Sequence, residues 1–190
     1  MKYPTLILMS AVLSLPAAAA AQYQQPSAGQ PKAIPQEQTR TAAAQASAKA
    51  FFTKAAHGNK AEMELAGLVQ QKSKDDRVKA FADQLMKDHQ QADGELRTVA
   101  KTKNIDLPTD MPSEAVATKT RLSKLEGAAF DRAYVDEMVK DHTQDVKEFE
   151  QAAKSSDADV KSFAEKTLPT LRDHLQRAQE LKRTLAGTGK

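Results

Sequence analysis

The amino-acid sequence predicts an all-α protein that folds as a four-helix bundle, and three observations support this fold class. From about residue 46 onward the chain is rich in Ala, Lys, Glu and Gln, with few Gly and almost no strand-like alternation. Its apolar residues recur at spacings of three and four, which is the pattern of amphipathic helices. The polar turns at 73–76 and 155–157 are followed by similar sequences, which indicates a duplicated helical hairpin.

The first 21 residues are typical of a secretory signal peptide. Lys2 supplies a positive charge, residues 6–15 form an apolar stretch, and the Ala-rich run at 17–21 offers a cleavage site before Gln22. The segment is too short to span a membrane, and no later segment approaches the ~20 consecutive apolar residues of a transmembrane helix. We therefore expect an exported mature chain, periplasmic or secreted, that has no transmembrane segment.

Residues 22–45 are rich in Gln, Pro and Ala without sustained periodicity, which predicts a disordered tether. Residues 186–190 are predicted as a frayed tail, so the bundle domain is expected to span residues 46–185. The formal net charge of the whole chain is only +3, which argues against a nucleic-acid binder. The sequence contains no Cys, which excludes disulfides, thiolate metal ligands and thiol nucleophiles.

Four long amphipathic helices are predicted in chain order. Their apolar faces run from Phe51 to Val69, from Val78 to Val99, from Tyr134 to Ala153 and from Val160 to Leu181. The polar turns join the first helix to the second and the third to the fourth, and they supply residues suited to helix N-caps.

The two hairpins are joined by a long connection at roughly 104–126. Pro108 and Pro112 break the chain there, and a short helix at about 114–125 is expected before Gly127. The connection is long enough to run the length of the bundle, as in ferritin-like folds. An up-down-up-down arrangement also fits the sequence, so the topology stays open at this point.

The dipeptide Asp-His occurs three times, at residues 88–89, 141–142 and 173–174. Each of these histidines falls on the apolar stripe of a predicted helix, where a leucine would be the usual core residue. A buried imidazole needs a hydrogen-bond partner or a metal, because an unsatisfied polar group in a core costs a few kcal/mol. The repeated dipeptide is therefore the strongest indication of a functional site.

Helix geometry places one ionisable residue of each long helix on its apolar face, all in the middle third of helices ~40 Å long. These residues are Glu62, His89, His142 and His174. Asp88 and Asp141 lie at the edge of the stripe, where each could support a histidine or meet solvent. One carboxylate and three imidazoles suit a divalent transition metal such as Fe, Mn, Zn or Cu, rather than Ca or Mg.

Two other interpretations remain open. In the first, the same residues form a metal-free structural layer in which Glu62 accepts hydrogen bonds from the histidines, and the protein acts through an unidentified envelope partner. In the second, the metal serves an oxidoreductase. The Glu-x-x-His motif of di-iron bundles is absent, because Met86, Val139 and Leu171 stand three residues before the histidines. The sequence therefore favours a protein that is not an enzyme.

Four stretches resemble an exported bacterial family known as domain of unknown function 4142: NKAEMELAGL (59–68), VKAFADQLMKDH (78–89), LEGAAFDRAYVDEMVKDH (125–142) and KTLPTLRDHL (166–175). The resemblance covers about residues 46–185. Members are grouped with ferritin-like bundles and are often labelled outer membrane proteins. The resemblance thus implies a ferritin-like fold and a place in the cell envelope.

The motif positions of that family fall on seven residues of this chain: Glu62, Asp88, His89, Asp131, Asp141, His142 and His174. Asp131 becomes a candidate supporting residue only through this resemblance. The chain has neither barrel strands nor a lipidation cysteine, so outer-membrane association has only the family label behind it. The combined expectation is a bundle that holds a transition metal in envelope metal handling or stress tolerance.

Overall fold

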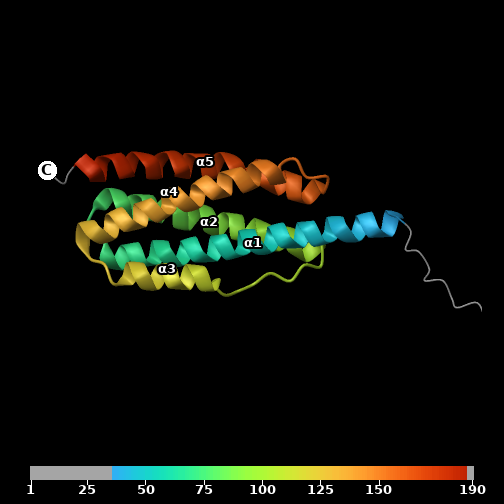
Figure 1. The fold of residues 1–190 in the computed structure, drawn as a ribbon, viewed down its shortest axis with the longest axis horizontal. Helices are drawn as coiled ribbons and strands as arrows, with labels where there is room; N and C mark the ends of the chain where they lie inside the picture. The colour runs from blue at the N-terminus through green and yellow to red at the C-terminus, as the bar shows by residue number, and fades with distance from the viewer. Residues whose placement is uncertain (1–35, 188–190) are drawn as a thin grey trace, which may run out of the picture. The chain divides into compact units, whose positions relative to one another are not determined.

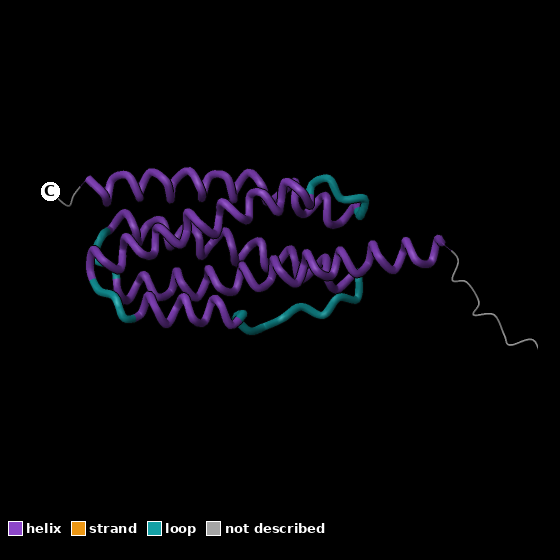
Figure 2. Tube along the Cα trace, viewed as in Figure 1, coloured by secondary structure: helices purple, strands orange, loops and turns teal. Residues whose placement is uncertain are grey.

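The computed structural model describes residues 36–187, and every regular element in this range is a helix (Figures 1 and 2). Four long helices form the bundle and one short helix, α3, lies on its side. The elements are α1 (Gln36–Lys72), α2 (Asp76–Thr102), α3 (Ser113–Ser123), α4 (Gly127–Ala152) and α5 (Ala158–Gly187). The predicted all-α class is confirmed.

The long connection determines the topology. Figure 1 shows the loop after α2 running back along the bundle into α3, so that α4 starts at the end where α2 also starts. Helices α2 and α4 therefore run in the same direction, which is the crossover arrangement of ferritin-like bundles. Helix α1 packs mainly on α2, and α4 mainly on α5, while contacts of α2 with α5 and of α1 with α4 close the bundle.

The two hairpin turns are built alike. In the first, Ser73 Oγ accepts a hydrogen bond from the Asp75 backbone N–H at 3.1 Å, and Asp75 caps the first turn of α2. In the second, Ser155 Oγ accepts from the Asp157 N–H at 3.1 Å, and the Asp157 side chain accepts from the N–H of Val160. The repeated capping geometry supports the predicted duplication, because side-chain caps satisfy the free N–H groups at a helix start.

The apolar core consists of two clusters separated along the bundle axis. One lies towards the end that carries the hairpin turn of α1 and α2, and includes Leu65, Leu85 and Met138. The other includes Phe52, Phe149 and Phe163, and the Phe52 and Phe163 rings meet edge to face at 6.0 Å between centroids. On every long helix, the residues between these clusters include one of the four predicted metal ligands.

The helical domain begins earlier than the sequence predicted. Helix α1 starts at Gln36, so residues 36–45 of the expected tether are helical. Residues 36–47 are all exposed and have no apolar stripe. The predicted start of the bundle at residue 46 depended on such a stripe, so this part of the helix was missed. Their Ala-rich composition favours a helix by intrinsic propensity alone. The predicted signal peptide, the rest of the tether and residues 188–190 lie outside the described residues.

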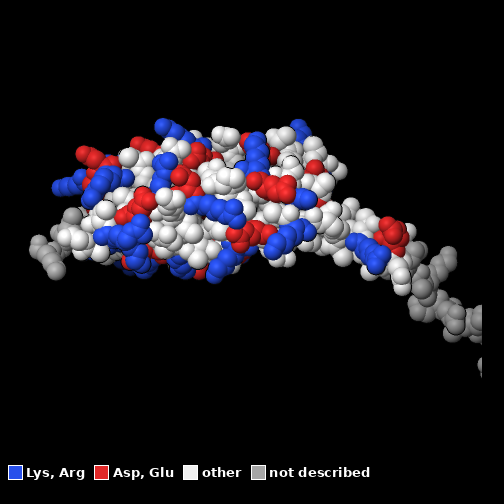
Figure 3. Space-filling model, turned by 90° about the horizontal axis from the view of Figure 1, so that it is seen from above, with Lys and Arg blue, Asp and Glu red and all other residues white. Residues whose placement is uncertain are grey.

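Helix α5 continues to Gly187 through Pro169, which lies inside it. None of the helices in residues 36–187 combines the length and the apolar composition needed to cross a membrane. On the face drawn in Figure 3, basic and acidic side chains of the described residues are interspersed. This face therefore lacks the concentrated positive charge of a nucleic-acid-binding surface.

Candidate metal centre

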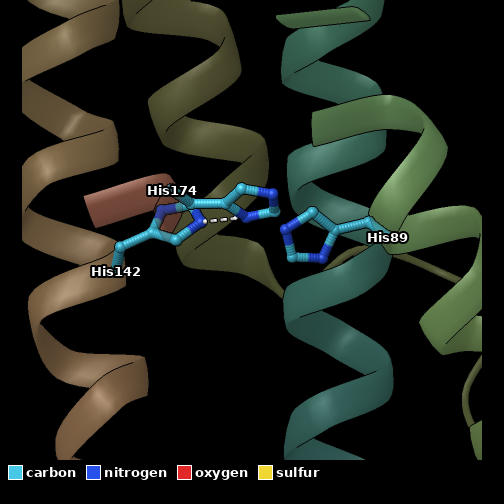
Figure 4. A group of neighbouring side chains, drawn as sticks. All are labelled: His89, His142 and His174. Atoms are coloured by element: carbon cyan, nitrogen blue, oxygen red, sulfur yellow. Dashed lines mark hydrogen bonds between the residues drawn. The ribbon is translucent and has the colours of Figure 1, made fainter. Parts of the chain in front are cut away.

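A polar layer crosses the bundle between the two apolar clusters. Each long helix contributes one residue to it: Glu62 from α1, His89 from α2, His142 from α4 and His174 from α5. All four are buried, with exposed fractions of 3%, 5%, 0% and 1%. The structure thus brings together the whole set expected from helix geometry, and Figure 4 shows the three imidazoles converging.

The four side chains approach one another closely. His89 Nε2 lies 2.9 Å from Glu62 Oε2, and His142 Nε2 lies 3.4 Å from the same oxygen. His142 Nε2 is 3.1 Å from His174 Nδ1, the contact drawn as a dashed line in Figure 4. One ring nitrogen from each histidine lies within 4.8 Å of the other two. The three histidines therefore share one centre, and Glu62 Oε2 lies beside two of their ring nitrogens.

The outer nitrogens of the three rings are held by oxygens that can only accept a hydrogen bond. These contacts are His89 Nδ1 to Asn59 Oδ1 at 3.0 Å, His142 Nδ1 to the Met138 carbonyl at 3.1 Å, and His174 Nε2 to Asp88 Oδ2 at 2.8 Å. Each outer nitrogen must therefore carry the proton and donate it. The inner nitrogen of each neutral ring is then left with a lone pair that faces the centre.

Four lone-pair acceptors facing one point repel one another unless a cation lies between them. In a fully neutral histidine set no proton remains for the contact between His142 Nε2 and His174 Nδ1. Glu62 Oε2 and His89 Nε2 are buried, and neither makes a well-aligned hydrogen bond with the described residues despite their 2.9 Å separation. The centre consequently requires either an additional proton or a metal ion.

The arrangement fits a metal ion. Ligands at ~2.0–2.1 Å from a tetrahedral Zn²⁺ lie about 3.3 Å from one another, and the closest separations here are 2.9, 3.1 and 3.4 Å. Oxygen acceptors behind metal-binding histidines fix the tautomer and the ring orientation. Three imidazoles and one carboxylate are donors that transition metals such as Zn, Fe, Mn and Cu accept.

The charges of the layer are set by burial and by mutual contact. Burial raises the pKa of the Glu62 carboxyl, but His142 and His89 outweigh this and bring it down to about 2. Burial lowers the pKa of His142, and it lowers that of His174 to about 4 despite the Asp88 hydrogen bond. At neutral pH, Glu62 is ionised and these two imidazoles are neutral, which are the forms that bind metals.

His89 differs from the other two histidines. Burial lowers its pKa, yet the adjacent Glu62 carboxylate outweighs burial and raises the pKa above its ordinary value. The Glu62 carboxylate therefore favours a proton on His89. A metal ion that binds there must displace that proton.

Asp88 supports a histidine on another helix rather than its own neighbour. Its carboxylate accepts a hydrogen bond from His174 and another from Gln84 Nε2 at 2.8 Å. Burial raises the Asp88 pKa, but the hydrogen bonds from Gln84 and His174 together outweigh burial. The pKa of Asp88 is therefore below its ordinary value. An ionised Asp88 holds the His174 N–H in place and leaves Nδ1 free for the centre.

The other two candidate supporting residues lie elsewhere. Asp141 is half-buried and makes no hydrogen bond to a histidine; its nearest cation is Lys140 at 3.8 Å. Burial and the nearby carboxylates of Glu137 and Glu62 raise the Asp141 pKa to about 7. Asp131 is buried on α4, eleven residues before His142 and thus about 16 Å away along the helix. The structure does not bring Asp131 to the centre.

The sequence analysis missed three groups beside the centre: the Asn59 amide, the Met138 carbonyl and Asp145. Asn59 precedes Glu62 by three residues, and this spacing, which places both on one face of α1, was a usable signal. The structure confirms that Asn59 is buried, with 7% exposed. Asp145 follows His142 by three residues. Burial and the Glu62 charge raise its pKa to about 8. The Met138 carbonyl is a backbone group, for which side-chain patterns carry no signal.

Comparisons with known proteins agree with this architecture. Residues 33–181 match a family described as "Domain of unknown function (DUF4142)". A DUF305 fragment from Deinococcus radiodurans is 14% identical with a TM-score of 0.64, and the match covers 72% of this chain and 95% of that one. A DUF305 protein from Streptomyces coelicolor, described as a candidate secreted protein, is 15% identical with a TM-score of 0.62, covering 73% and 92%. These likenesses show the fold alone, and no curated protein matches the chain.

Proposed function

The chain belongs to the DUF4142 family, whose description assigns no activity, and from the polar layer we propose that the protein binds one divalent transition-metal ion. The ligands are Glu62, His89, His142 and His174. The observation that carries this proposal is the set of inner lone pairs. Each outer ring nitrogen donates to an oxygen, so three ring nitrogens face a common point inside the bundle, and Glu62 Oε2 lies 2.9 and 3.4 Å from two of them.

The ligand count suggests what the ion does. Four protein ligands complete a tetrahedral shell, whereas a catalytic metal keeps an open position for water or substrate. The site is therefore suited to holding an ion rather than to turning over a substrate. Fe, Mn, Zn and Cu all accept this donor set, which is poor in the oxygen ligands that Ca and Mg prefer.

The cellular role follows from the same proposal. If residues 1–21 act as a signal peptide, the bundle works in the periplasm or outside the cell. A metal-holding protein there would buffer ions that enter the envelope, or contribute to tolerance of metal stress. This location rests on the sequence interpretation of residues that the structure does not describe.

A second function has one observation in its favour. The raised pKa of His89 supports a metal-free layer in which a proton on His89 pairs with Glu62. In that case the layer is only structural, and the protein acts through a binding partner. The two proposals differ in their response to metal, because a structural layer gains nothing from an added ion.

Metal titration of the purified protein tests the proposal. Zn²⁺, Fe²⁺, Mn²⁺ and Cu²⁺ are each added to untagged protein in competition with a chromophoric chelator, and wild type is compared with His89→Ala. We expect wild type to bind one equivalent of at least one ion and His89→Ala to lose it. His57→Ala is the matched control, since His57 is a histidine of α1 outside the layer. Wild type that binds no ion stoichiometrically would overturn the proposal.

A further inference from the structure

A cavity of about 620 Å³ lies beside the polar layer, between α1, the start of α3 and α4. Glu62 forms part of its wall, so the cavity reaches the proposed metal centre. On the opposite side, between α2 and α5, the opening next to His89 and His174 measures only about 70 Å³. The centre therefore has one wide approach and one narrow approach.

The wide cavity is acidic. Five carboxylates line it, those of Glu62, Glu114, Glu137, Asp141 and Asp145, against two lysines. Both lysines are already engaged, because Lys54 pairs with Glu148 and Lys140 pairs with Glu137. Acidic walls of a hollow concentrate the electric field and attract cations.

Two of these carboxylates lie close to the centre. Asp141 and Asp145 are one helical turn apart on α4, so they share a face of that helix. Asp145 forms no hydrogen bond or ion pair with the described residues, and it also lines a small hollow of about 30 Å³ with His89 and Asn59. Asp141 has only the loose contact with Lys140. Among the described residues, neither carboxylate is held by a close ion pair.

Glu62 connects the cavity to the polar layer. Glu62 is 3% exposed, and its Oε2 lacks a well-aligned hydrogen bond among the described residues. It belongs both to the cavity wall and to the polar layer. A cation that enters the cavity would therefore meet Asp141 and Asp145 first and the proposed metal ligand Glu62 next.

We infer that this cavity is a vestibule in which Asp141 and Asp145 bind a hydrated divalent cation and deliver it to Glu62. The inference rests on the proposed function and adds an access route to it. Carboxylate oxygens suit an ion that keeps its water shell, and the imidazoles replace that shell in the centre. The opposite opening is less suitable, because its acids are already engaged: Asp88 by His174 and Glu95 by Lys166.

The rate of loading with Co²⁺ tests the inference, since a cobalt ion bound by nitrogen and oxygen ligands absorbs visible light. Co²⁺ alone is mixed with metal-free protein in a stopped-flow instrument at low ionic strength and above pH 8, where Asp141 and Asp145 are ionised. Asp141→Asn/Asp145→Asn is expected to load at least ~10-fold more slowly than wild type, as electrostatic steering contributes 10–10³ in rate. The difference should shrink at high salt. The final spectrum should match that of wild type, because neither aspartate is a ligand of the centre.

Asp136→Asn/Asp173→Asn is the matched control, because it removes two exposed acids that lie outside the cavity. It is expected to load at nearly the wild-type rate, and equal slowing in both variants would reduce the effect to overall charge and overturn the inference. The inference would also be overturned if Asp141→Asn/Asp145→Asn loaded at the wild-type rate or gave an altered final spectrum. Neither result would contradict the proposed metal centre itself. Wild type that takes up no Co²⁺ would count instead against the proposed function. If circular dichroism shows that the double variant is unfolded, Asp145→Asn alone carries the test.

Discussion

The two apolar clusters and the polar layer between them are built from the same four helices, but different physical effects stabilise them. In the clusters, side chains such as Phe52 and Leu85 are fully buried and need nothing beyond close packing. In the layer, Glu62 and three histidines are equally buried and need compensation for lost hydration. The clusters therefore account for the fold, whereas the layer depends on what occupies its centre.

This difference separates stability from function within one core. Apolar residues of suitable volume could fill the layer and hold the bundle together without any of its hydrogen bonds. The chain instead positions three imidazoles with dedicated acceptors on Asn59, Met138 and Asp88. The proposed metal ion would account for this arrangement, and changes to the two regions should then have different consequences.

The largest expected effect comes from the apolar region. Phe52→Ala should lower the free energy of unfolding by about 3–5 kcal/mol, because it removes a fully buried aromatic ring and leaves a cavity. The loss should be the same with and without metal, and urea denaturation measures it. Val116→Ala, on the exposed face of α3, is the control and should change stability little. If added metal restored the free energy of unfolding lost in Phe52→Ala, the apolar cluster and the polar layer would not be energetically independent.

Metal should stabilise the protein through the layer alone. An ion at 100–1,000 times its dissociation constant should raise the free energy of unfolding by about 3–4 kcal/mol. Thermal denaturation with the ion and with excess chelator checks this. The gain should be absent in His142→Ala and retained in His57→Ala, and an equal gain in both variants would show that the ion binds elsewhere.

Removing the charge of Asp88, which accepts the hydrogen bond from His174, should weaken metal affinity without abolishing metal binding. Asp88→Asn keeps the shape of the side chain but removes the charge that accepts the His174 hydrogen bond. Loss of such a supporting group typically weakens metal affinity 10–100-fold. Competition titration should show this decrease, while Asp173→Asn, beside the same histidine but exposed, should leave affinity unchanged. An unaltered affinity in Asp88→Asn would mean that His174 does not bind the ion.

The smallest expected effect is a pH dependence of the metal-free protein. The folded-state pKa values of Asp141 and Asp145, about 7 and about 8, lie above their unfolded value of 3.8. The neutral carboxyls therefore stabilise the fold at low pH, and this contribution is lost as pH rises through 7 to 8. His89, whose pKa is also raised, changes in the same direction, whereas His142 and His174, whose pKa values are lowered, act in the opposite direction, chiefly below pH 6.5.

Between pH 6.5 and 8 the metal-free protein should thus lose about 1–2 kcal/mol, a figure discounted for solvent screening of the partly exposed acids. Urea denaturation at several pH values measures the trend. Asp141→Asn/Asp145→Asn should show a much flatter profile. Stability that rises with pH in wild type would contradict the charge distribution described here.

Sequence periodicity was sufficient to place the four residues of the polar layer because they obey simple helix geometry. A residue such as His89 could be assigned to a buried face from its spacing and to a height from the rise per residue. The two possible bundle topologies place these faces equally well, so only the structure showed the crossover. Residues 36–47 were missed as helix because an exposed Ala-rich segment has no apolar stripe.

Contacts between distant parts of the chain were beyond sequence reasoning. Asp88 was expected either to support a histidine or to meet solvent, and the packing of α2 against α5 directs it to His174. The acidic cavity exists because α3 and the loop before it cover α1 and α4 incompletely next to Glu62. Neither feature follows from a local pattern, since both depend on how helices pack.

Elemental analysis by mass spectrometry of the native protein tests the central claim most directly. The protein should be purified from its own cells without chelators and without a histidine tag, and then quantified against its chain concentration. We predict close to one equivalent of Fe, Mn, Zn or Cu per chain. No metal above background, both as purified and after incubation with each of these ions, would contradict the account and leave the histidine layer as a purely structural element.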